Sequence, residues 1–317
     1  MKRYDEKEVR YILGQGHFDE AQSVFLARQL THIRAQTLTV KKAALNAFQV
    51  FPVQTDVPEG AETAIQRVYD SVGTAEIISN YADDLKRVDL LAQENSVRVF
   101  SLGDAYGYNE NEIANAQFAG MNLDAMKAQA ARRGIDLKLN KLAWHGDKAH
   151  NIIGFLNNPN ISEYALPGDG TGSSTKISTK TEEQIIRDFN GLIRAVSVAT
   201  NEVETVNTVC MAPDVYAHIS MTRLSHSDKT LFDFIKSVHP EVTRWMPVGE
   251  LKGAASDGSD MMFAGYFDPA YIKFEIPMRF KQLPVERRNL EYIVNCMAKA
   301  IGVTVTIPYA FVTANGC

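Results

Sequence analysis

Ser225, His226 and Asp228 are the residue types that serve as nucleophile, general base and orienting acid in many hydrolases. Such a triad could cleave esters or amides, because the imidazole takes the hydroxyl proton as the oxygen attacks a carbonyl. Triad members converge from distant parts of a fold, whereas these three are close neighbours in the sequence. The spacing favours a polar loop, and a soluble hydrolase built from dispersed His and Asp residues is kept only as an alternative.

Two other groups contain possible cation ligands. His145, Asp147 and His150 offer imidazole and carboxylate groups, but the histidines are not at the i, i+4 spacing of helical zinc sites. Asp257 and Asp260 flank a Gly-Ser pair that lacks the alternating ligands and closing Glu of an EF-hand loop. We interpret both groups as polar turns, and the sequence predicts no metal and no cofactor.

The glycine-rich stretch at 168–172 could be mistaken for a phosphate-binding loop. It lacks the Gly-Lys-Ser/Thr ending of such loops, and no apolar strand leads into it. We interpret it as part of a mobile loop over 167–181. No residue pattern in the chain therefore predicts catalysis, and we expect a protein that is not an enzyme.

Composition limits the remaining classes. The chain has 317 residues, of which 45% are hydrophobic, enough to build one large or two ordinary domains. A net charge of -5 and the absence of a Lys or Arg tract argue against sequence-specific nucleic-acid binding. No apolar window is long enough for a membrane span, and the first residues lack a signal-peptide core, so we expect synthesis in a cytoplasm.

The cysteines are odd in number and far apart, which argues against a disulfide framework. Two of them fit small core positions, and we expect the third, Cys317, to be an exposed thiol. They are Cys210, Cys296 and Cys317.

Apolar periodicity then predicts the elements. A helix over 19–48 ends where Phe51-Pro52-Val53 interrupts it, and a second over 182–200 begins with Thr181 and Gln184 as a capping box. Further predicted elements are a strand and short helix within 207–221, a helix at 230–238, strands at 261–265 and 272–276, and two or three strands in the last 30 residues.

The longest predicted helix covers 109–143. Asn109 caps its start with Glu112 at the third position, and Gly120 interrupts a run that Asn122 can recap, which leaves a kink possible. Its apolar stripe is thin, so we expect the helix to lie across a sheet or a neighbouring chain. The stripe consists of Leu123, Met126, Ala130, Ile135, Leu137 and Leu142.

A β-hairpin is predicted over 63–78, with a type I turn at 70–73 where Asp is first and Gly fourth. Neither face of its first strand is cleanly apolar, so such an arm needs a neighbouring subunit to cover it. The two faces are Ile65, Arg67 and Tyr69 on one side and Ala64, Gln66 and Val68 on the other.

The order of these elements and several strings along nearly the whole chain resemble a known family. The strings lie at 25–30, 57–61, 101–108, 119–124, 154–161, 260–262 and 302–308. They are similar to those of major capsid proteins of tailed bacteriophages with the Hong Kong 97-type fold. The resemblance implies an α+β fold and a structural protein that self-assembles into an icosahedral shell enclosing a double-stranded DNA genome.

The resemblance also implies a division of the chain. It places an N-arm at 1–55, an extended loop at 56–83, a peripheral domain at 84–199 and 276–317 that includes a spine helix at 109–143, and an axial domain at 200–275. In the extended loop it implies contacts between subunits. We expect Ile65, Val68, Tyr69, Ile77 and Ile78 to be buried there, and Arg67 and Glu76 to form ion pairs.

The implied partners are further copies of the chain, arranged as hexamers and pentamers. The resemblance also implies portal, scaffold or decoration proteins, and packaged DNA that is bound without sequence specificity. It implies no membrane. Some family members cross-link subunits through a Lys of the extended loop, but 62–81 contains none, so no such cross-link is expected here. We expect the protein in the virion, after assembly in the host cytoplasm. A cargo-enclosing nanocompartment of the encapsulin type shares the fold and stays open as an alternative.

Overall fold

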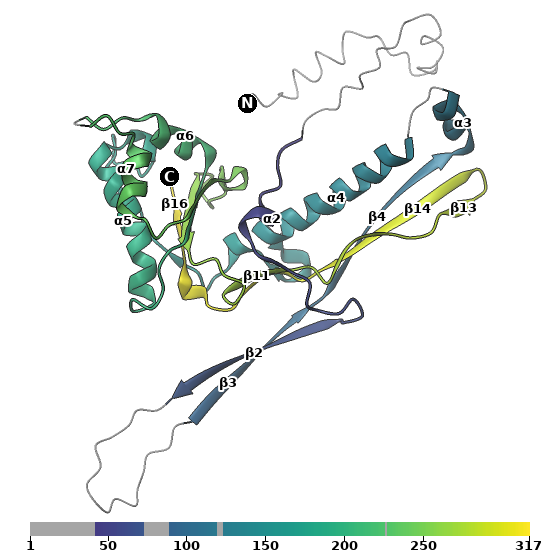
Figure 1. The fold of residues 1–317 in the computed structure, drawn as a ribbon, viewed down its shortest axis with the longest axis horizontal. Coiled ribbons are helices and arrows are strands. Elements are labelled where there is room, and N and C mark those ends of the chain that lie inside the picture. Colours follow the sequence, from purple (N-terminus) through teal and green to yellow (C-terminus); the bar gives the residue numbers. More distant parts are fainter. Residues whose placement is uncertain (1–41, 73–88, 119–122, 226) are drawn as a thin grey trace, which may run out of the picture.

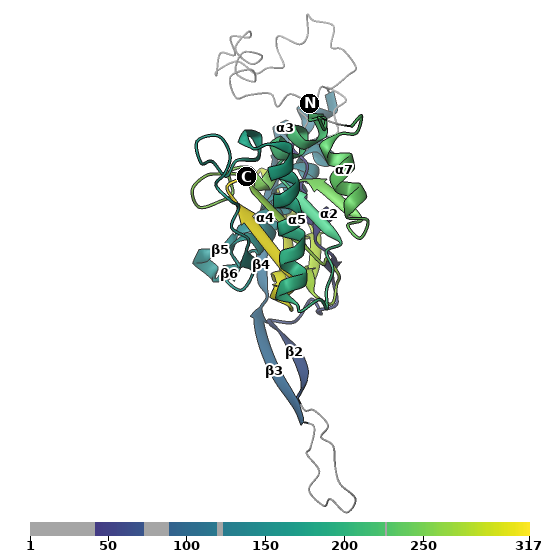
Figure 2. The ribbon, with the colours of Figure 1, turned by 90° about the vertical axis from the view of Figure 1, so that its left-hand side faces the viewer.

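The computed structural model describes residues 42–72, 89–118, 123–225 and 227–317 (Figure 1). The described chain has three parts: a lobe rich in helices, an elongated platform of long strands beneath a long helix, and a narrow β-hairpin that projects from their junction (Figures 1 and 2). We call them the helical lobe, the platform and the hairpin.

A five-stranded sheet forms the centre of the helical lobe. Its order is β7-β16-β10-β8-β9, in which β10 runs antiparallel to both of its neighbours and the two outer pairings are parallel. The strands are β7 (Ser162–Glu163), β8 (Thr208–Met211), β9 (Arg244–Pro247), β10 (Met261–Gly265) and β16 (Phe311–Asn315). Every residue of β8 and β10 is buried, which explains their uninterrupted apolar sequences.

Three helices accompany this sheet: α5 (Glu182–Ala199), α6 (Pro213–Met221) and α7 (Leu231–Val238). The apolar side chains of α5 recur at helical spacing and pack on β10 and β16. At its start the Thr181 N–H donates to Gln184 Oε1 at 2.8 Å, which confirms the predicted pairing of these two residues. The predicted helix at 230–238 is also confirmed, beginning at Leu231.

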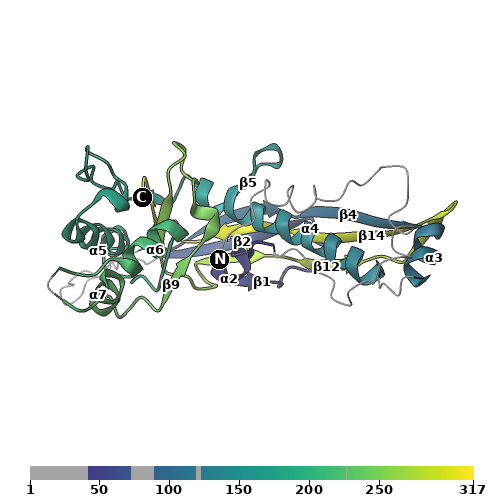
Figure 3. The ribbon, with the colours of Figure 1, turned by 90° about the horizontal axis from the view of Figure 1, so that it is seen from above.

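The platform is built around β14 (Glu291–Ala300). On one side β14 pairs with β4 (Phe100–Asn109) along ten residues without a register shift. On the other side it pairs with β12 (Met278–Gln282) and β13 (Glu286–Arg288). Seen from above, α4 (Leu123–His145) runs along these strands (Figure 3).

The predicted helix over 109–143 is described in two pieces, α3 (Glu110–Phe118) and α4, with 119–122 outside the description. The Asn109 N–H donates to Glu112 Oε2 at 3.4 Å, which supports the predicted cap. The predicted position across a sheet is confirmed, since Lys127 Nζ donates to Gly107 O of β4 at 2.6 Å.

The predicted apolar stripe of this helix is partly wrong. Met126 and Leu137 are 44% and 48% exposed, because the buried face is offset from the predicted one. The buried apolar side chains of α4 are Ala131, Ile135, Leu139, Leu142, Ala143 and Trp144.

The junction holds the aromatic part of the core. Phe51 lies 4.8 Å from Trp144 and 5.3 Å from Phe155, measured between ring centroids, and Phe155 lies 4.9 Å from Phe263 of β10. This cluster ties α4 to the sheet of the helical lobe. The remaining elements of the described ranges are short: α2 (Ala47–Val50), β1 (Val53–Gln54), β5 (Gly146–Asp147), β6 (Ile152–Ile153), β11 (Ile272–Glu275), β15 (Gly302–Val305), and 3₁₀ turns η2 (Lys148–His150), η3 (Phe155–Asn157), η4 (Ile177–Thr179), η5 (Gly249–Leu251) and η6 (Pro308–Ala310).

Most of the predicted helix over 19–48 lies outside the described residues. Within them, 42–46 are not helical and α2 starts only at Ala47, so that end of the prediction is wrong. The predicted break is confirmed, because α2 ends at Val50 and Phe51 is extended. After it, β1 pairs in parallel with β11, which anchors this segment in a three-stranded sheet with β15.

The hairpin consists of β2 (Thr63–Val72) and β3 (Asp89–Arg98), paired along ten residues. The predicted turn at 70–73 is wrong, because Asp70, Ser71 and Val72 are strand residues that pair with Leu91, Leu90 and Asp89. Long-range pairing outweighs the local turn preference of Asp and Gly here. The hairpin therefore extends to residue 98, beyond the residue 83 at which the resemblance places the end of the extended loop.

Candidate assembly surface

One face of the hairpin is exposed along both strands. On β2, Ile65 and Tyr69 are 61% and 62% exposed, with Arg67 between them. Side chains two residues apart share a face of a strand, and directly paired residues share it across the ladder. The same face of β3 therefore carries the paired residues Ser96, Glu94 and Ala92, which are also exposed.

Among the described residues of this face, Arg67 and Glu94 form an ion pair. Arg67 Nε is 2.7 Å from Glu94 Oε1, and both side chains are more than half exposed. Exposed pairs of this kind contribute at most about 1 kcal/mol, because water screens them. Arg67 thus has a partner within its own chain, and its predicted role between subunits stays a prediction.

Few contacts of the described residues hold the hairpin to the body. Gln66 Nε2 donates to Thr306 Oγ1 at 2.7 Å, and at the base the Val99 N–H donates to Glu62 O at 2.9 Å. A two-stranded ribbon is marginally stable by itself in water. A surface of this shape is suited to packing against another molecule.

Of the seven predicted contact residues, Ile65, Arg67 and Tyr69 lie together on the exposed face. Val68 is a residue of β2 whose backbone pairs with Gln93 of β3. Glu76, Ile77 and Ile78 lie outside the described residues.

The platform offers a second candidate surface that we did not predict from the sequence, the outer edge of β4. No strand of the described ranges pairs with β4 on the side away from β14. The sequence signal that could have indicated this edge is the composition of 100–109, which is typical of a strand and includes neither Pro nor Lys. On one face of β4, Leu102 and Tyr106 are half-buried and pack on the core, while Asp104 between them is exposed.

Of the residues that could have formed a catalytic triad, Asp228 is exposed and Ser225 has a structural role. Ser225 Oγ donates to Glu182 Oε1 at 2.8 Å, and the Ser225 N–H donates to Glu182 Oε2 at 2.9 Å. These hydrogen bonds hold Ser225 next to Glu182, the first residue of α5. His226 lies outside the described residues.

The group around Asp147 is a polar turn. Asp147 accepts hydrogen bonds from Lys138 Nζ at 2.8 Å and from the Ala149 N–H at 3.1 Å, and His150 Nδ1 lies 3.3 Å away. The Lys138 hydrogen bond is the main cause that lowers the pKa of Asp147 to about 2. Within the described parts of the chain, no three His, Cys, Asp or Glu side chains are grouped so that they could hold a metal ion.

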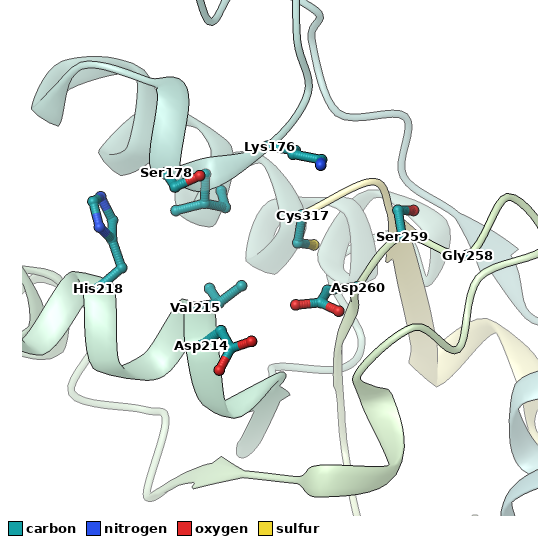
Figure 4. Close-up of a pocket in the computed structure, with 10 residues that line it drawn as sticks. Lys176, Ser178, Asp214, Val215, His218, Gly258, Ser259, Asp260 and Cys317 are labelled. Carbon is teal, nitrogen blue, oxygen red and sulfur yellow. The ribbon is translucent and has the colours of Figure 1, made fainter.

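A cavity of about 260 Å³ lies in the helical lobe, where Asp214, His218, Asp260 and Cys317 surround it (Figure 4). Its carboxylates already have partners: Asp214 forms an ion pair with Lys252, and Asp260 Oδ1 accepts the Gly253 N–H at 2.8 Å. These contacts give both carboxylates structural roles, and they do not indicate a reaction at the cavity.

Cys317 is buried, so the predicted exposed thiol is wrong. The N–H groups of Gly316 and Cys317 both donate to Asp260 O at 3.1 Å, which holds this segment against the lobe. Burial raises the pKa of the Cys317 thiol to about 12, so the reactive thiolate is scarce at neutral pH. Cys210 and Cys296 are buried as predicted.

None of the helices in the described ranges is both long and apolar enough to cross a membrane.

The comparisons with known proteins agree with the geometry, which is suited to packing against other molecules. A family model described as "Major capsid protein" matches residues 73–317. No curated protein sequence matches the chain.

Among solved structures, the capsid of Myoviridae phage XM1 is 18% identical, with a TM-score of 0.77 over 93% of this chain and 99% of that chain. The capsid of an empty GTA particle is 10% identical, with a TM-score of 0.61 over 94% and 99%. A virus-like particle from Pyrococcus furiosus is 11% identical, with a TM-score of 0.51 over 84% and 91%. The chain has the mixed helix and sheet fold of phage capsid proteins.

Proposed function

Since this chain belongs to the major capsid protein family and is a structural protein of a capsid shell, we propose that it forms the icosahedral head of a tailed phage. The subunits are arranged as hexamers and pentamers around packaged double-stranded DNA. The observation that supports this most directly is the family match over 73–317 together with the length of the match to a phage capsid.

The hairpin acts as an arm that reaches over a neighbouring subunit. Ile65, Tyr69, Val68, Ile77 and Ile78 become buried at that contact, while Arg67 and Glu76 form ion pairs across it. The exposure of Ile65 and Tyr69 supports this, because burying an apolar side chain stabilises by about 1.5–3 kcal/mol. Closed symmetry repeats each such contact many times, so individually weak contacts suffice.

We keep the division of the chain that the family resemblance implies, except that the extended loop is longer. The N-arm covers 1–55, the extended loop covers 56–98 because β3 pairs with β2, and the axial domain covers 200–275. The remaining residues form the peripheral domain, with α4 as the main part of its spine helix.

The interior of the shell holds DNA without reading its sequence. The net charge of -5 suits a wall that confines DNA and does not attract it. The role is structural and not enzymatic, with assembly in the host cytoplasm alongside portal, scaffold or decoration proteins.

A nanocompartment that encloses a protein cargo is the second candidate. It would share the shell fold, and the chain is similar to a virus-like particle from Pyrococcus furiosus, although the TM-score of 0.51 is below the 0.77 for the phage XM1 capsid.

Electron microscopy of the purified protein, before and after nuclease treatment of lysed particles, tests the proposal. We expect closed icosahedral particles or capsomer rings, and nuclease-sensitive contents in particles purified from infected or induced cells. Particles that contain a protein cargo and no DNA would favour the nanocompartment. A uniformly small species at all salt and pH conditions, with or without added scaffold, would contradict a shell.

A further inference from the structure

A groove lies beside α4, between this helix, strand β12 and the segment around β1. Its volume is about 420 Å³, and most of the side chains that line it are apolar. Two of these apolar side chains are buried and three are half-buried, so the groove has an apolar floor. They are Phe48, Val53, Leu139, Ile276 and Phe280.

Charged groups lie on two sides of this groove. On the α4 side, the Asp136 carboxylate is half-buried, with Arg132 Nε 4.0 Å away. Burial raises the pKa of Asp136 although Arg132 and Arg133 act to lower it, so the negative charge is incompletely compensated. On the β12 side, Arg279 is exposed and has no ion-pair partner among the described residues. The groove is therefore suited to a ligand that brings a cation to Asp136 and an anion to Arg279.

The exposed face of the hairpin carries complementary groups. Arg67 of β2 and Glu94 of β3 form an ion pair across the two strands, and both side chains are more than half exposed. Ile65 and Tyr69 lie on either side of Arg67 along β2, so they share its face and are exposed as well. This face offers a cation, an anion and two apolar side chains, which are the groups that the groove can accept.

The hairpin and the groove lie on opposite sides of the platform. In Figure 1 the hairpin projects below the long strands, whereas α2 and α4 lie above them. Figure 3 shows α4, β1 and β12, which line the groove, from above. The hairpin thus points away from the groove of its own chain, and a second copy must bring the two together. Contacts between two different surfaces of identical subunits repeat head to tail, and they close into rings when the rotation fits, as hexamers and pentamers require.

We propose that the hairpin of one subunit docks in the groove beside α4 of a second copy, with Arg67 beside Asp136 and Glu94 beside Arg279. This rests on the proposed function, in which the hairpin contacts a neighbour. The Arg67–Glu94 pair then lies across the groove, and each of its charges gains a second partner of opposite sign. Docking in the reverse orientation would place Glu94 beside Asp136, and like charges in contact disfavour an interface.

The apolar side chains of the hairpin supply the rest of the contact. Ile65 and Tyr69 cover the floor of the groove and leave water, which favours association. An aromatic side chain such as Tyr69 can bury about 150–250 Å². Hydrogen bonds between charged groups are stronger than neutral ones, so the pair of Arg67 with Asp136 fixes the position of the hairpin in the groove.

Photo-cross-linking identifies the surface that contacts the hairpin. Subunits carrying Tyr69→p-benzoylphenylalanine are co-assembled with excess wild-type subunits, irradiated, and digested for mass spectrometry. We expect dimers in which the hairpin is joined to groove peptides of a second copy. Gln66→p-benzoylphenylalanine is the matched control and should give adducts within one chain, because the Gln66 side chain hydrogen-bonds to Thr306 of its own chain. The groove peptides are those that cover 48–53, 132–139 and 276–280.

A photoreactive residue in the groove gives the reciprocal test. We expect Phe280→p-benzoylphenylalanine to form adducts with peptides from 63–72 or 89–98 of a second copy. Adducts with 1–41, which lie outside the described residues, would assign the groove to another segment of the chain and overturn the proposal.

A double-mutant cycle tests the charge contact. We expect Arg67→Ala and Asp136→Asn each to raise the protein concentration needed for assembly about tenfold, because each leaves a charge without its partner. Since both remove the same contact, the double variant should need about the same concentration as either single variant. Asp228→Asn removes an exposed carboxylate of the helical lobe and should leave this concentration unchanged. Effects that multiply in the double variant would show that the two residues are not in contact.

The outcomes separate this proposal from the proposed function. Shells of normal appearance whose hairpin adducts map outside the groove would overturn the docking alone. Absence of wild-type shells under all conditions would overturn the proposed function and, with it, this inference.

Discussion

At the scale of single residues, Lys180 and Asp188 determine how the loop before α5 is held. Both side chains are fully buried and form an ion pair inside the helical lobe. Arg187 Nη2 lies 2.7 Å from Asp188, and Arg187 Nη1 lies 2.5 Å from Asp169 at the rim. The glycine-rich loop, which by composition resembled a phosphate cradle, thus carries a carboxylate that pairs with α5.

We expect Asp188→Asn to lower the free energy of unfolding by about 3–5 kcal/mol, because the Lys180 ammonium stays buried without its main counter-charge. Urea unfolding of unassembled subunits measures this. Asp169→Asn, at a position that is 31% exposed, is the matched control and should cost about 1 kcal/mol or less. If both variants lost the same stability, the buried pair would not be the main contact.

The lowered pKa of Asp147 predicts that its contribution to stability depends on pH. Its folded pKa of about 2 is below the ordinary value of 3.8, so the folded state favours the carboxylate. The stabilisation is therefore fully present above about pH 5 and is lost as the pH falls through the folded pKa.

We accordingly expect the difference in melting temperature between the wild-type subunit and Asp147→Asn to be constant above about pH 5 and to shrink toward pH 2. Thermal melts of both proteins across this range provide the test. Asp228→Asn, which removes an exposed carboxylate, is a control for acid effects elsewhere. A difference that grew on acidification would contradict the assigned role of Lys138.

At the scale of elements, Asn140 of α4 joins three segments that are distant in the sequence. Its Oδ1 accepts the Ala47 N–H at the start of α2 at 3.0 Å, and its Nδ2 donates to Glu250 Oε1 at 2.8 Å. Glu250 of η5 also accepts from Asn46 Nδ2 at 2.6 Å. The first four N–H groups of a helix have no partner within it, so Asn140 supplies one from outside.

Replacing Asn140 with Leu should therefore cost about 1–3 kcal/mol, since the Ala47 N–H and Glu250 lose buried partners. Hydrogen exchange in peptides covering 44–54 should speed up more than in the rest of the chain. Lys141→Ala, exposed on the same helix, controls for general effects on α4. Unchanged protection of 44–54 would show that the aromatic cluster holds this segment without Asn140.

At the scale of the whole molecule, the hairpin is separable from the body in the described residues. The Glu62 carbonyl and the Val99 N–H are already joined at its base, so a short glycine linker can replace 63–98. The body loses the Gln66 to Thr306 hydrogen bond, worth about 1 kcal/mol.

We expect this deletion to leave a folded, soluble subunit whose melting temperature changes by only about 2–4 °C, and to abolish shell formation. Circular dichroism and electron microscopy measure the two properties separately. Arg67→Ala in the intact chain, which keeps the hairpin, is the milder comparison. Normal shells from the deleted chain would refute the hairpin as an assembly arm.

Local sequence determined those elements whose signals lie within a few residues. The apolar spacing and the Thr181 cap of α5, the Pro213 start of α6 and the buried strand β8 need no distant partner to be recognised. The resemblance in short strings likewise led to the capsid family, because those strings are local too. The alternation of Ile65, Arg67 and Tyr69 on one face of a strand was also visible in the sequence.

Tertiary structure alone decided what depends on distant pairing. Asp70–Val72 are strand and not turn because β3 extends alongside them, and no local signal reveals the partner's length. Cys317 is buried because Asp260 accepts two N–H groups from its segment. The open edge of β4 exists only because β14 occupies the other side, so a sequence can predict a strand but not which of its edges lacks a partner.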